Sequence, residues 1–272
     1  MRISYKKCVA SSAFTRTDTI ALIGIVLLIA MFLWARFAGG FEKYRTISCA
    51  HHMKRLGQAF SEYAQNHDDA LPPAVVDDGT NSTSWDKEIS VYLEPELAKQ
   101  NSPDSEKALK AKIAPLFKCP SDRELRGGSK PRSYSMPMYD INRVGWPPDK
   151  NSLGGLGLYL DAQTIQTARE ADSTKSADYV PAIKTSMVPD PADTALLVER
   201  ISIPNALWGT KYACIISTRE QFDAKTFAAE DFHGGKMNYL MLDGHVELLL
   251  PIQAGGHVGA GNEGLWSIRS GD

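Results

Sequence analysis

Two histidines and two carboxylates near the C-terminus could do chemistry. His233 opens the stretch HGGKMNYLMLDGHVELLL, and Asp243, His245 and Glu247 follow in the same stretch. Imidazole and carboxylate groups suit zinc or manganese, and a carboxylate-rich loop suits calcium. Each residue also has a structural explanation, because Asp243 belongs to a turn, His245 and Glu247 share one face of a strand, and His233 can bind a backbone carbonyl. We predict structural roles and keep His233, Asp243 and His245 as candidate metal ligands, with calcium as the candidate ion.

The sequence carries no recognisable catalytic motif. It has no GxSxG, HExxH, Walker loop or dinucleotide fingerprint. The four cysteines include no Cys-x-x-Cys pair, which argues against a zinc site or a thioredoxin-like centre. Its 30 basic and 32 acidic residues are interspersed and give a net charge of −2, so no basic face is available for phosphate. We predict a protein that is not an enzyme and does not bind nucleic acid.

Three of these four residues, Asp243, His245 and Glu247, lie on a predicted β-hairpin over residues 237–250. MNYLML and HVELLL are strand-like runs joined by Asp243-Gly244, whose tolerance of positive φ suits a two-residue type I′ turn. His233-Gly234-Gly235 forms the bend before the hairpin. Upstream, the apolar run in DPADTALLVERISI predicts a buried strand, at whose end Glu199 must be either exposed or paired.

An amphipathic helix is predicted from Phe41 to about His67. Five side chains recur at spacings of 4, 3, 4 and 3 and so form one stripe: Cys49, Met53, Leu56, Phe60 and Tyr63. The helix must stop before Pro72-Pro73. The remaining chain is long enough for one domain of about 200 residues with its own core.

One long apolar run lies near the N-terminus. Ile20 to Ala35, IALIGIVLLIAMFLWA, has no charge, and with its flanks it reaches the roughly 20 residues that span a bilayer. We predict a transmembrane helix at about residues 19–38. No small-residue cleavage site follows Ala38, which favours a retained helix over a secretory signal peptide. Asp18 lies at the rim of the run, where a carboxylate without a partner is costly.

The residues around this run resemble the prepilin signal of type IV pilins and type II secretion pseudopilins. A basic leader ends at Ala13, the next residues are Phe14 and Thr15, and the fifth position after the leader is acidic, Asp18. The resemblance implies that a prepilin peptidase cuts after Ala13 and methylates the new amine of Phe14. It also implies that Asp18 pairs with the N-terminal amine of a neighbouring subunit. The sequence departs from the family in having Ala for Gly and Asp for Glu at these positions.

A second resemblance covers the C-terminal motif. In this motif a His is followed, after nine residues, by an Asp-Gly pair. It resembles the C-terminal motif of a family of prepilin-like proteins from planctomycetes and verrucomicrobia. The residues that carry the resemblance are His233, Gly234, Gly235, Asn238, Asp243, Gly244 and His245. The islands SCAHHMKRLGQAFSEYAQNHDDALPP, Trp85, FKCPSD, SY and the Leu196–Glu199 strand end stand upstream in the family's order. The resemblance implies a pilin-like α+β fold, in which a long N-terminal helix packs on an antiparallel sheet.

Together the resemblances imply an organisation for the whole chain. Residues 1–13 form the leader, 14–67 the long helix and 68–272 an α+β domain outside the cytoplasm. Basic residues flank both ends of the apolar run, so charge does not choose the orientation. The resemblance places the protein in the inner membrane as a single-pass protein with a periplasmic domain. In that compartment Cys49 and Cys119 would form a disulfide, and Cys214 would be a buried thiol.

The expected function is that of a pilin-like structural subunit in a type II secretion or type IV pilus-like assembly. Its expected partners are other pilin-like subunits, the prepilin peptidase and inner-membrane lipid. The alternative is a single-pass anchored protein whose outer domain binds a ligand or calcium and does not polymerise.

Overall fold

The computed structural model describes residues 15–272 apart from positions 78, 80–81, 101, 124–126, 150, 153, 172–178, 201–204, 210–214, 217–232, 255–263 and 269–272. Ala13, Phe14 and Cys214 therefore lie outside the described residues. The chain divides into two compact units, Met1–Lys43 and Tyr44–Asp272.

The described elements combine helices and strands. The helices are α1 (Arg16–Asn66), α2 (Trp85–Glu88), α3 (Ser90–Leu93), α4 (Pro95–Ala98), α5 (Pro103–Phe117), α6 (Ile141–Val144), α7 (Ala162–Ala171) and α9 (Pro251–Ala254), with 3-10 turns η1 (Thr185–Met187) and η4 (Gly264–Trp266). The strands are β1 (Val75–Asp77), β2 (Ser82–Ser84), β3 (Tyr134–Tyr139), β4 (Gly157–Asp161), β5 (Ala195–Glu199), β6 (Ile215–Ile216), β7 (Met237–Met241) and β8 (Val246–Leu249).

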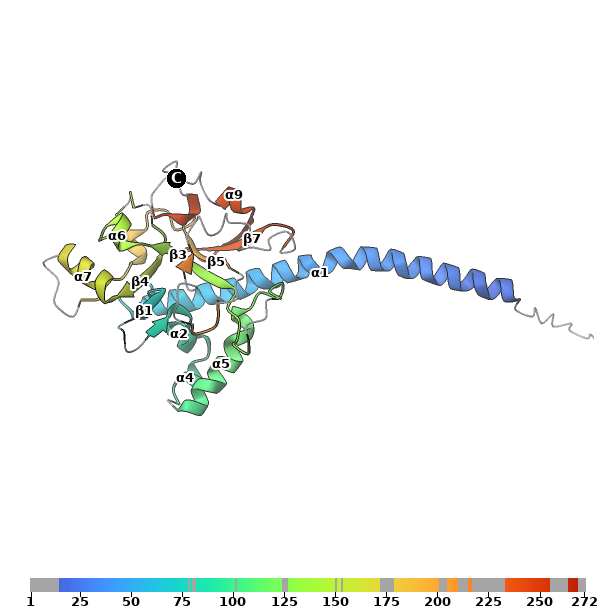
Figure 1. Ribbon diagram of the computed structural model, residues 1–272, viewed down its shortest axis with the longest axis horizontal. Helices are drawn as coiled ribbons and strands as arrows, with labels where there is room; N and C mark the ends of the chain where they lie inside the picture. The colour runs from blue at the N-terminus through green and yellow to red at the C-terminus, as the bar shows by residue number, and fades with distance from the viewer. Residues whose placement is uncertain are drawn as a thin grey trace, which may run out of the picture. The chain divides into compact units, whose positions relative to one another are not determined.

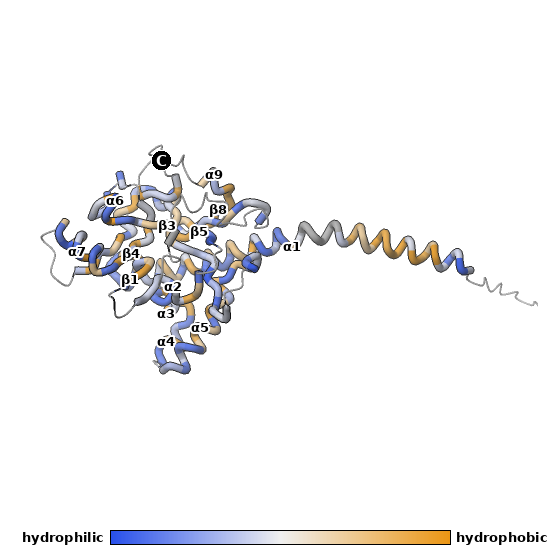
Figure 2. The backbone as a smooth tube through the Cα atoms, viewed as in Figure 1, coloured by the Kyte–Doolittle hydropathy of each residue, from blue (hydrophilic) through white to orange (hydrophobic). Residues whose placement is uncertain are grey.

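The first unit contains the apolar start of α1. Over Arg16–Trp34 this helix is long and apolar enough to cross a membrane, and none of that span is buried. Figure 2 shows the hydrophobic colour along this stretch. Ile20 and Trp34 are 70% and 80% exposed, far more apolar surface than a water-facing helix carries. By length and composition the same segment also fits a signal sequence. The predicted N-terminal apolar helix is thus present, and its orientation is not fixed by these features.

The second part of α1 forms the core of the Tyr44–Asp272 unit. Cys49, Met53, Leu56 and Phe60 are all at most 1% exposed, which confirms these four positions of the predicted stripe. Tyr63, the fifth, is only partly buried against the same core cluster. The helix comes close to the sheet at Gly57, where a Cβ atom would lie 3.1 Å from Leu240 Cδ1 of β7. The absence of a side chain at this position permits the close approach.

The sheet is mixed, not antiparallel as expected. Its described strands follow the order β2-β1-β4-β3-β5-β7-β8, with β6 beside β3. Figure 1 labels the inner strands β1, β4, β3, β5 and β7 of this sheet. β3, β5, β7 and β8 pair antiparallel, whereas β4 is parallel to both β1 and β3. Parallel neighbours need a long crossover, and the segment with α6 between β3 and β4 provides one. The coarse prediction of an N-terminal helix with a mixed α/β domain is confirmed, and the wholly antiparallel sheet is wrong.

Both faces of the central strands are covered. Leu240 of β7 packs in the cluster that includes Leu56 of α1. Its neighbours Tyr239 and Met241 belong to a second cluster with Trp266 on the other face. Alternate residues of a strand point to opposite faces, so burial on both sides explains why all residues of β5 and β7 are buried.

The predicted C-terminal hairpin is present, but its turn differs from the prediction. Leu240 pairs with Val246, and the amide of Met241 donates to the His245 carbonyl at 2.9 Å. Three residues therefore form the loop, and of these only Gly244 has a positive φ, 93°, as in a type I turn followed by a bulge. The loop is widened because the amide of Leu242 donates to Thr194 O at 2.9 Å.

A buried ion pair lies near the start of α2. Arg132 Nη1 and Asp86 Oδ1 are 2.7 Å apart, and both side chains are fully buried. The second Asp86 oxygen accepts from the Trp208 amide at 2.6 Å, and Arg132 Nε donates to Asn205 Oδ1 at 2.8 Å. Both charges are thus compensated by hydrogen bonds as well as by each other.

Candidate functional site

Asp18 caps its own helix. Its Oδ2 accepts from the Thr15 amide at 3.0 Å and from Thr15 Oγ1 at 2.6 Å, and its amide donates back to Thr15 Oγ1 at 3.3 Å. This reciprocal arrangement is a capping box. Local helix capping is therefore one role of Asp18, and its carboxylate remains exposed.

The motif residues separate into two places. Asp243 and His245 lie on the exposed hairpin turn, where His245 Nδ1 and Asp243 Oδ1 are 2.6 Å apart. His233 and Asn238 instead lie in the interior, beside Glu199. The candidate ligand set His233, Asp243 and His245 is thus not brought together.

The expected disulfide is not formed. Cys49 and Cys119 are both free thiols, and both are buried. The two cysteines do lie in one cluster, because hydrogen bonds and Coulomb contacts link both of them to Glu199 and to each other. Reasoning about a disulfide partner therefore identified the right neighbours, which this structure holds as two thiols.

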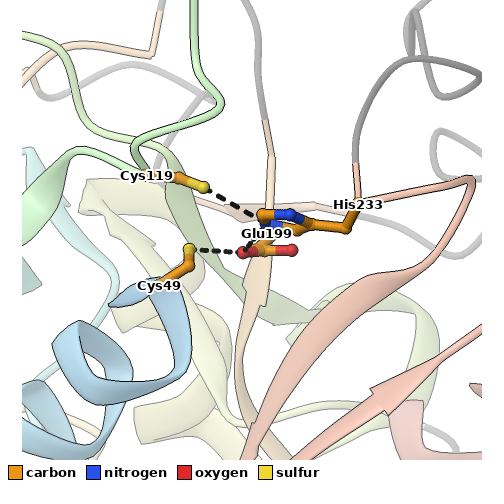
Figure 3. Close-up of side chains that lie close together, drawn as sticks. All are labelled: Cys49, Cys119, Glu199 and His233. Carbon is orange, nitrogen blue, oxygen red and sulfur yellow. Dashed lines mark hydrogen bonds and ion pairs between the residues drawn. The ribbon is translucent and has the colours of Figure 1, made fainter. Parts of the chain in front are cut away.

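Four donor side chains meet in the interior: Cys49, Cys119, Glu199 and His233. Their ligand atoms all lie within 4.8 Å of one another, and Figure 3 shows them facing a common centre. Cys119 Sγ is 3.3 Å and Glu199 Oε1 is 3.2 Å from His233 Nε2. The Cys49 thiol donates to Glu199 Oε1 at 2.5 Å. Among the residues that the structure describes, this is the one group of at least three such donors found close enough to hold a metal ion.

Each donor comes from a different element. Cys49 lies on the buried stripe of α1, and Cys119 lies just after α5 in a turn closed by the Asp122 amide, which donates to Cys119 O at 2.9 Å. Glu199 is the last residue of β5. His233 precedes β7 with φ of 47°, an unusual left-handed conformation for a residue with a side chain.

Hydrogen bonds fix the histidine and the carboxylate. Thr46 Oγ1 lies 2.9 Å from His233 Nδ1, so Nε2 is the ring nitrogen that faces the other donors. Glu199 Oε2 accepts from the Asn238 amide at 2.7 Å, and Oε1 accepts from Asn238 Nδ2 at 3.0 Å. Asn238 of the motif therefore serves to orient Glu199.

The two cysteines are held in a similar way. Tyr134 Oη lies 3.1 Å from Cys49 Sγ. The Cys119 amide donates to Ser133 Oγ at 2.9 Å, and that hydroxyl donates to Asp122 Oδ2 at 2.5 Å. The loop that carries Cys119 is thus attached to the segment leading into β3.

Burial and mutual contacts shift the acidities of the cluster. Burial, with the Cys119 hydrogen bond and the Glu199 charge, raises the pKa of Cys49 well above its ordinary value. Burial also disfavours ionised Cys119, but hydrogen bonds with Cys49 and His233 outweigh it and lower the pKa of Cys119. Burial alone would lower the pKa of His233, yet contacts with Cys119 and Glu199 raise it to about 10. The contacts with Cys119 and Glu199 therefore favour the protonated form of the His233 ring.

The arrangement fits metal binding better than nucleophilic catalysis. A Cys119–His233 pair could form a reactive thiolate, but Cys119 has no exposed surface to meet a substrate. His233 Nε2 also faces both Cys119 and Glu199, so the ring does not relay a proton from one to the other through its two nitrogens. Two hollows on the described surface, one lined by Lys87 and Trp208 and another by Phe60 and Thr185, contain none of the four donors.

Sequence reasoning missed this site because its donors are remote in the chain. Cys49 and Glu199 are 150 positions apart, and Cys119 and His233 are 114 apart. The search for Cys-x-x-Cys spacing could not detect them. A usable signal was the unexplained Glu199 at the end of a buried strand, because a carboxylate there requires partners.

The chain was compared with protein-family models, curated proteins and solved structures, and none of them matches.

Proposed function

We propose that the protein is a membrane-anchored, pilin-like structural subunit of a type II secretion or type IV pilus-like assembly. In this proposal the apolar part of α1 anchors the chain in the inner membrane, and the mixed α/β domain lies in the periplasm. Other pilin-like subunits and a prepilin peptidase are its partners.

The observation that carries the proposal is that α1 has an apolar, unburied first part and a later part that packs in the domain core. One helix of 51 residues has an unburied apolar part, Arg16–Trp34, and a later part whose stripe from Cys49 to Phe60 forms the domain core. Each Leu, Ile, Val or Phe at the centre of a membrane helix favours insertion by about 0.3–0.6 kcal/mol. A subunit that assembles within a membrane through helix packing needs these two properties in one helix.

Mass spectrometry of the N-terminus tests the processing. The full-length chain is expressed with a prepilin peptidase, and the mature protein should begin at Phe14, with a methylated amine. The Ala13→Leu variant should stay uncut, because the leader that a prepilin peptidase cleaves ends in a small residue. Recovery of intact Met1, or of a cut beyond Ala38 as a signal peptidase would make, refutes the proposed mechanism.

Co-purification of two differently tagged copies tests assembly through Asp18. In Asp18→Asn we expect recovery of the second tag to fall to background, because the carboxylate that would pair with a neighbouring amine is gone. Asp18 also caps α1 through Thr15, so Thr15→Val is the matched control: it weakens the cap and keeps the charge. Equal losses in the two variants would assign the effect to capping and contradict an assembly role.

The competing function is a single-pass anchored protein that binds a ligand or calcium without polymerising. Calcium takes six to eight oxygen ligands, whereas the one donor cluster found among the described residues has two thiols and an imidazole. The structure thus gives calcium no support in the part it describes. Copies that remain separate with wild-type Asp18 would favour this alternative.

A further inference from the structure

We propose that Cys49, Cys119, Glu199 and His233 bind one zinc ion that holds the domain together. The inference is independent of the proposed assembly, because it rests on donor atoms within the Tyr44–Asp272 unit alone. It also extends the metal candidates drawn from the C-terminal motif, since only His233 belongs to both sets.

The donor spacing suits a tetrahedral ion. With Zn–S of about 2.3 Å and Zn–N or Zn–O of about 2.0–2.2 Å, neighbouring donors of a tetrahedral site lie about 3.3–3.8 Å apart. The His233 Nε2 distances to Cys119 Sγ and Glu199 Oε1 are 3.3 and 3.2 Å. The Cys49–Glu199 contact of 2.5 Å is a hydrogen bond, and it must lengthen by about 1 Å when a metal replaces the shared proton.

The donor types select zinc among common ions. Two thiolates, one imidazole and one carboxylate are all established zinc ligands. Calcium and magnesium need several oxygen ligands, and this cluster offers one carboxylate. Iron–sulfur clusters are held mainly by four cysteines, and only Cys49 and Cys119 take part here. Soft sulfur donors with one imidazole in a four-donor set favour tetrahedral zinc.

The surrounding hydrogen bonds already have the form of a second ligand shell. Metal-bound histidines direct their other ring nitrogen to a protein acceptor, and His233 Nδ1 lies 2.9 Å from Thr46 Oγ1. Ligating carboxylates are themselves hydrogen-bonded, as Glu199 is by the amide and side chain of Asn238. The ligands are therefore oriented before any ion arrives.

The site is structural in character. Four protein donors complete a zinc shell and leave no open position for water or substrate, and all four residues are buried. They come from α1, the segment after α5, the end of β5 and the turn before β7. An ion at their centre would link the long helix to the sheet and the hairpin, so its binding free energy would add to folding.

Metal analysis of full-length protein tests the site. The chain is purified in mild detergent with reductant and measured by inductively coupled plasma mass spectrometry. We expect one zinc per chain in the wild type and loss of zinc in His233→Gln and Cys119→Ser. His245→Gln is the matched control, because it removes an exposed histidine of the same motif and should keep the ion.

A second readout covers variants that fail to fold. Wild-type protein loaded with Co²⁺ should show a thiolate-to-cobalt charge-transfer band. Thr46→Val, which leaves every ligand in place, should bind the ion about 10–100-fold more weakly. Wild-type protein without zinc and without this band overturns the proposal. So does a Cys49–Cys119 disulfide, seen as a mass two hydrogens lower, in protein isolated from its own compartment without reductant.

Discussion

Removing the carboxylate of Asp86 should strongly destabilise the Tyr44–Asp272 unit. Asp86→Ala leaves the Arg132 guanidinium fully buried without its ion-pair partner at 2.7 Å. It also leaves the buried Ser84 hydroxyl without its acceptor and the Trp208 amide without an acceptor at 2.6 Å. A buried charge that loses its ion-pair partner is among the costliest defects in a protein.

The expected magnitude follows from this burial. Breaking a fully buried ion pair costs about 3–5 kcal/mol. For a domain of about 150–250 residues each kcal/mol lowers Tm by about 2–4 °C, so Asp86→Ala should lower Tm by about 6–20 °C. The matched control is Glu106→Ala, which removes the partner of Lys87 in a half-exposed pair with N–O distance 3.2 Å. That change should cost at most about 1 kcal/mol.

Urea unfolding of the full-length chain in mild detergent, followed by tryptophan fluorescence, measures the loss of unfolding free energy in both variants. Thermal unfolding followed by the same fluorescence measures their Tm. The double variant Asp86→Leu/Arg132→Met should recover much of the loss, because an apolar pair of similar volume leaves no buried charge. Equal, small effects of Asp86→Ala and Glu106→Ala would refute the reasoning. A double variant less stable than the single one would show that packing around Arg132, and not its charge, dominates.

Two further results are expected. Contact with Asp243 raises the pKa of His245, although partial burial opposes this shift. The stabilising contact between the two side chains is therefore present at low pH and is lost as pH rises through the raised pKa. In Asp243→Asn, NMR titration should show the His245 pKa falling toward its ordinary value, and an unchanged pKa would contradict the contact. Gly155→Ala should lower the free energy of unfolding by about 1–3 kcal/mol, because the new Cβ would lie 2.6 Å from the Pro137 carbonyl oxygen. An unchanged urea midpoint would contradict this and show that the backbone around residue 155 shifts to make room for the methyl group.

The local patterns of the sequence predicted the elements well. The stripe from Cys49 to Phe60 is buried as its spacing requires, since helical periodicity is a property of neighbouring residues. The hairpin of β7 and β8 follows from two strand-like runs around Asp243-Gly244. The turn type could not be predicted, because the Leu242 amide binds Thr194 in a distant segment.

The pairing of strands lay beyond local patterns. β1 pairs in parallel with β4, which lies far from it along the chain. Nothing in the residues of either strand indicates which strand is its partner. Pairing depends on which crossover the intervening chain makes, and that is decided when the whole sheet forms. The expectation of an antiparallel sheet failed for this reason.

The sequence by itself determined an apolar N-terminal helix, a buried stripe on its continuation and a C-terminal hairpin. Each of these is encoded by residues within a few turns or pleats of one another. Only the tertiary structure decided that Cys49, Cys119, Glu199 and His233 share one buried centre, while Asp243 and His245 stay on the surface. Donor atoms from four separate elements converge only when helix, sheet and turn have packed, and no spacing along the chain records that convergence.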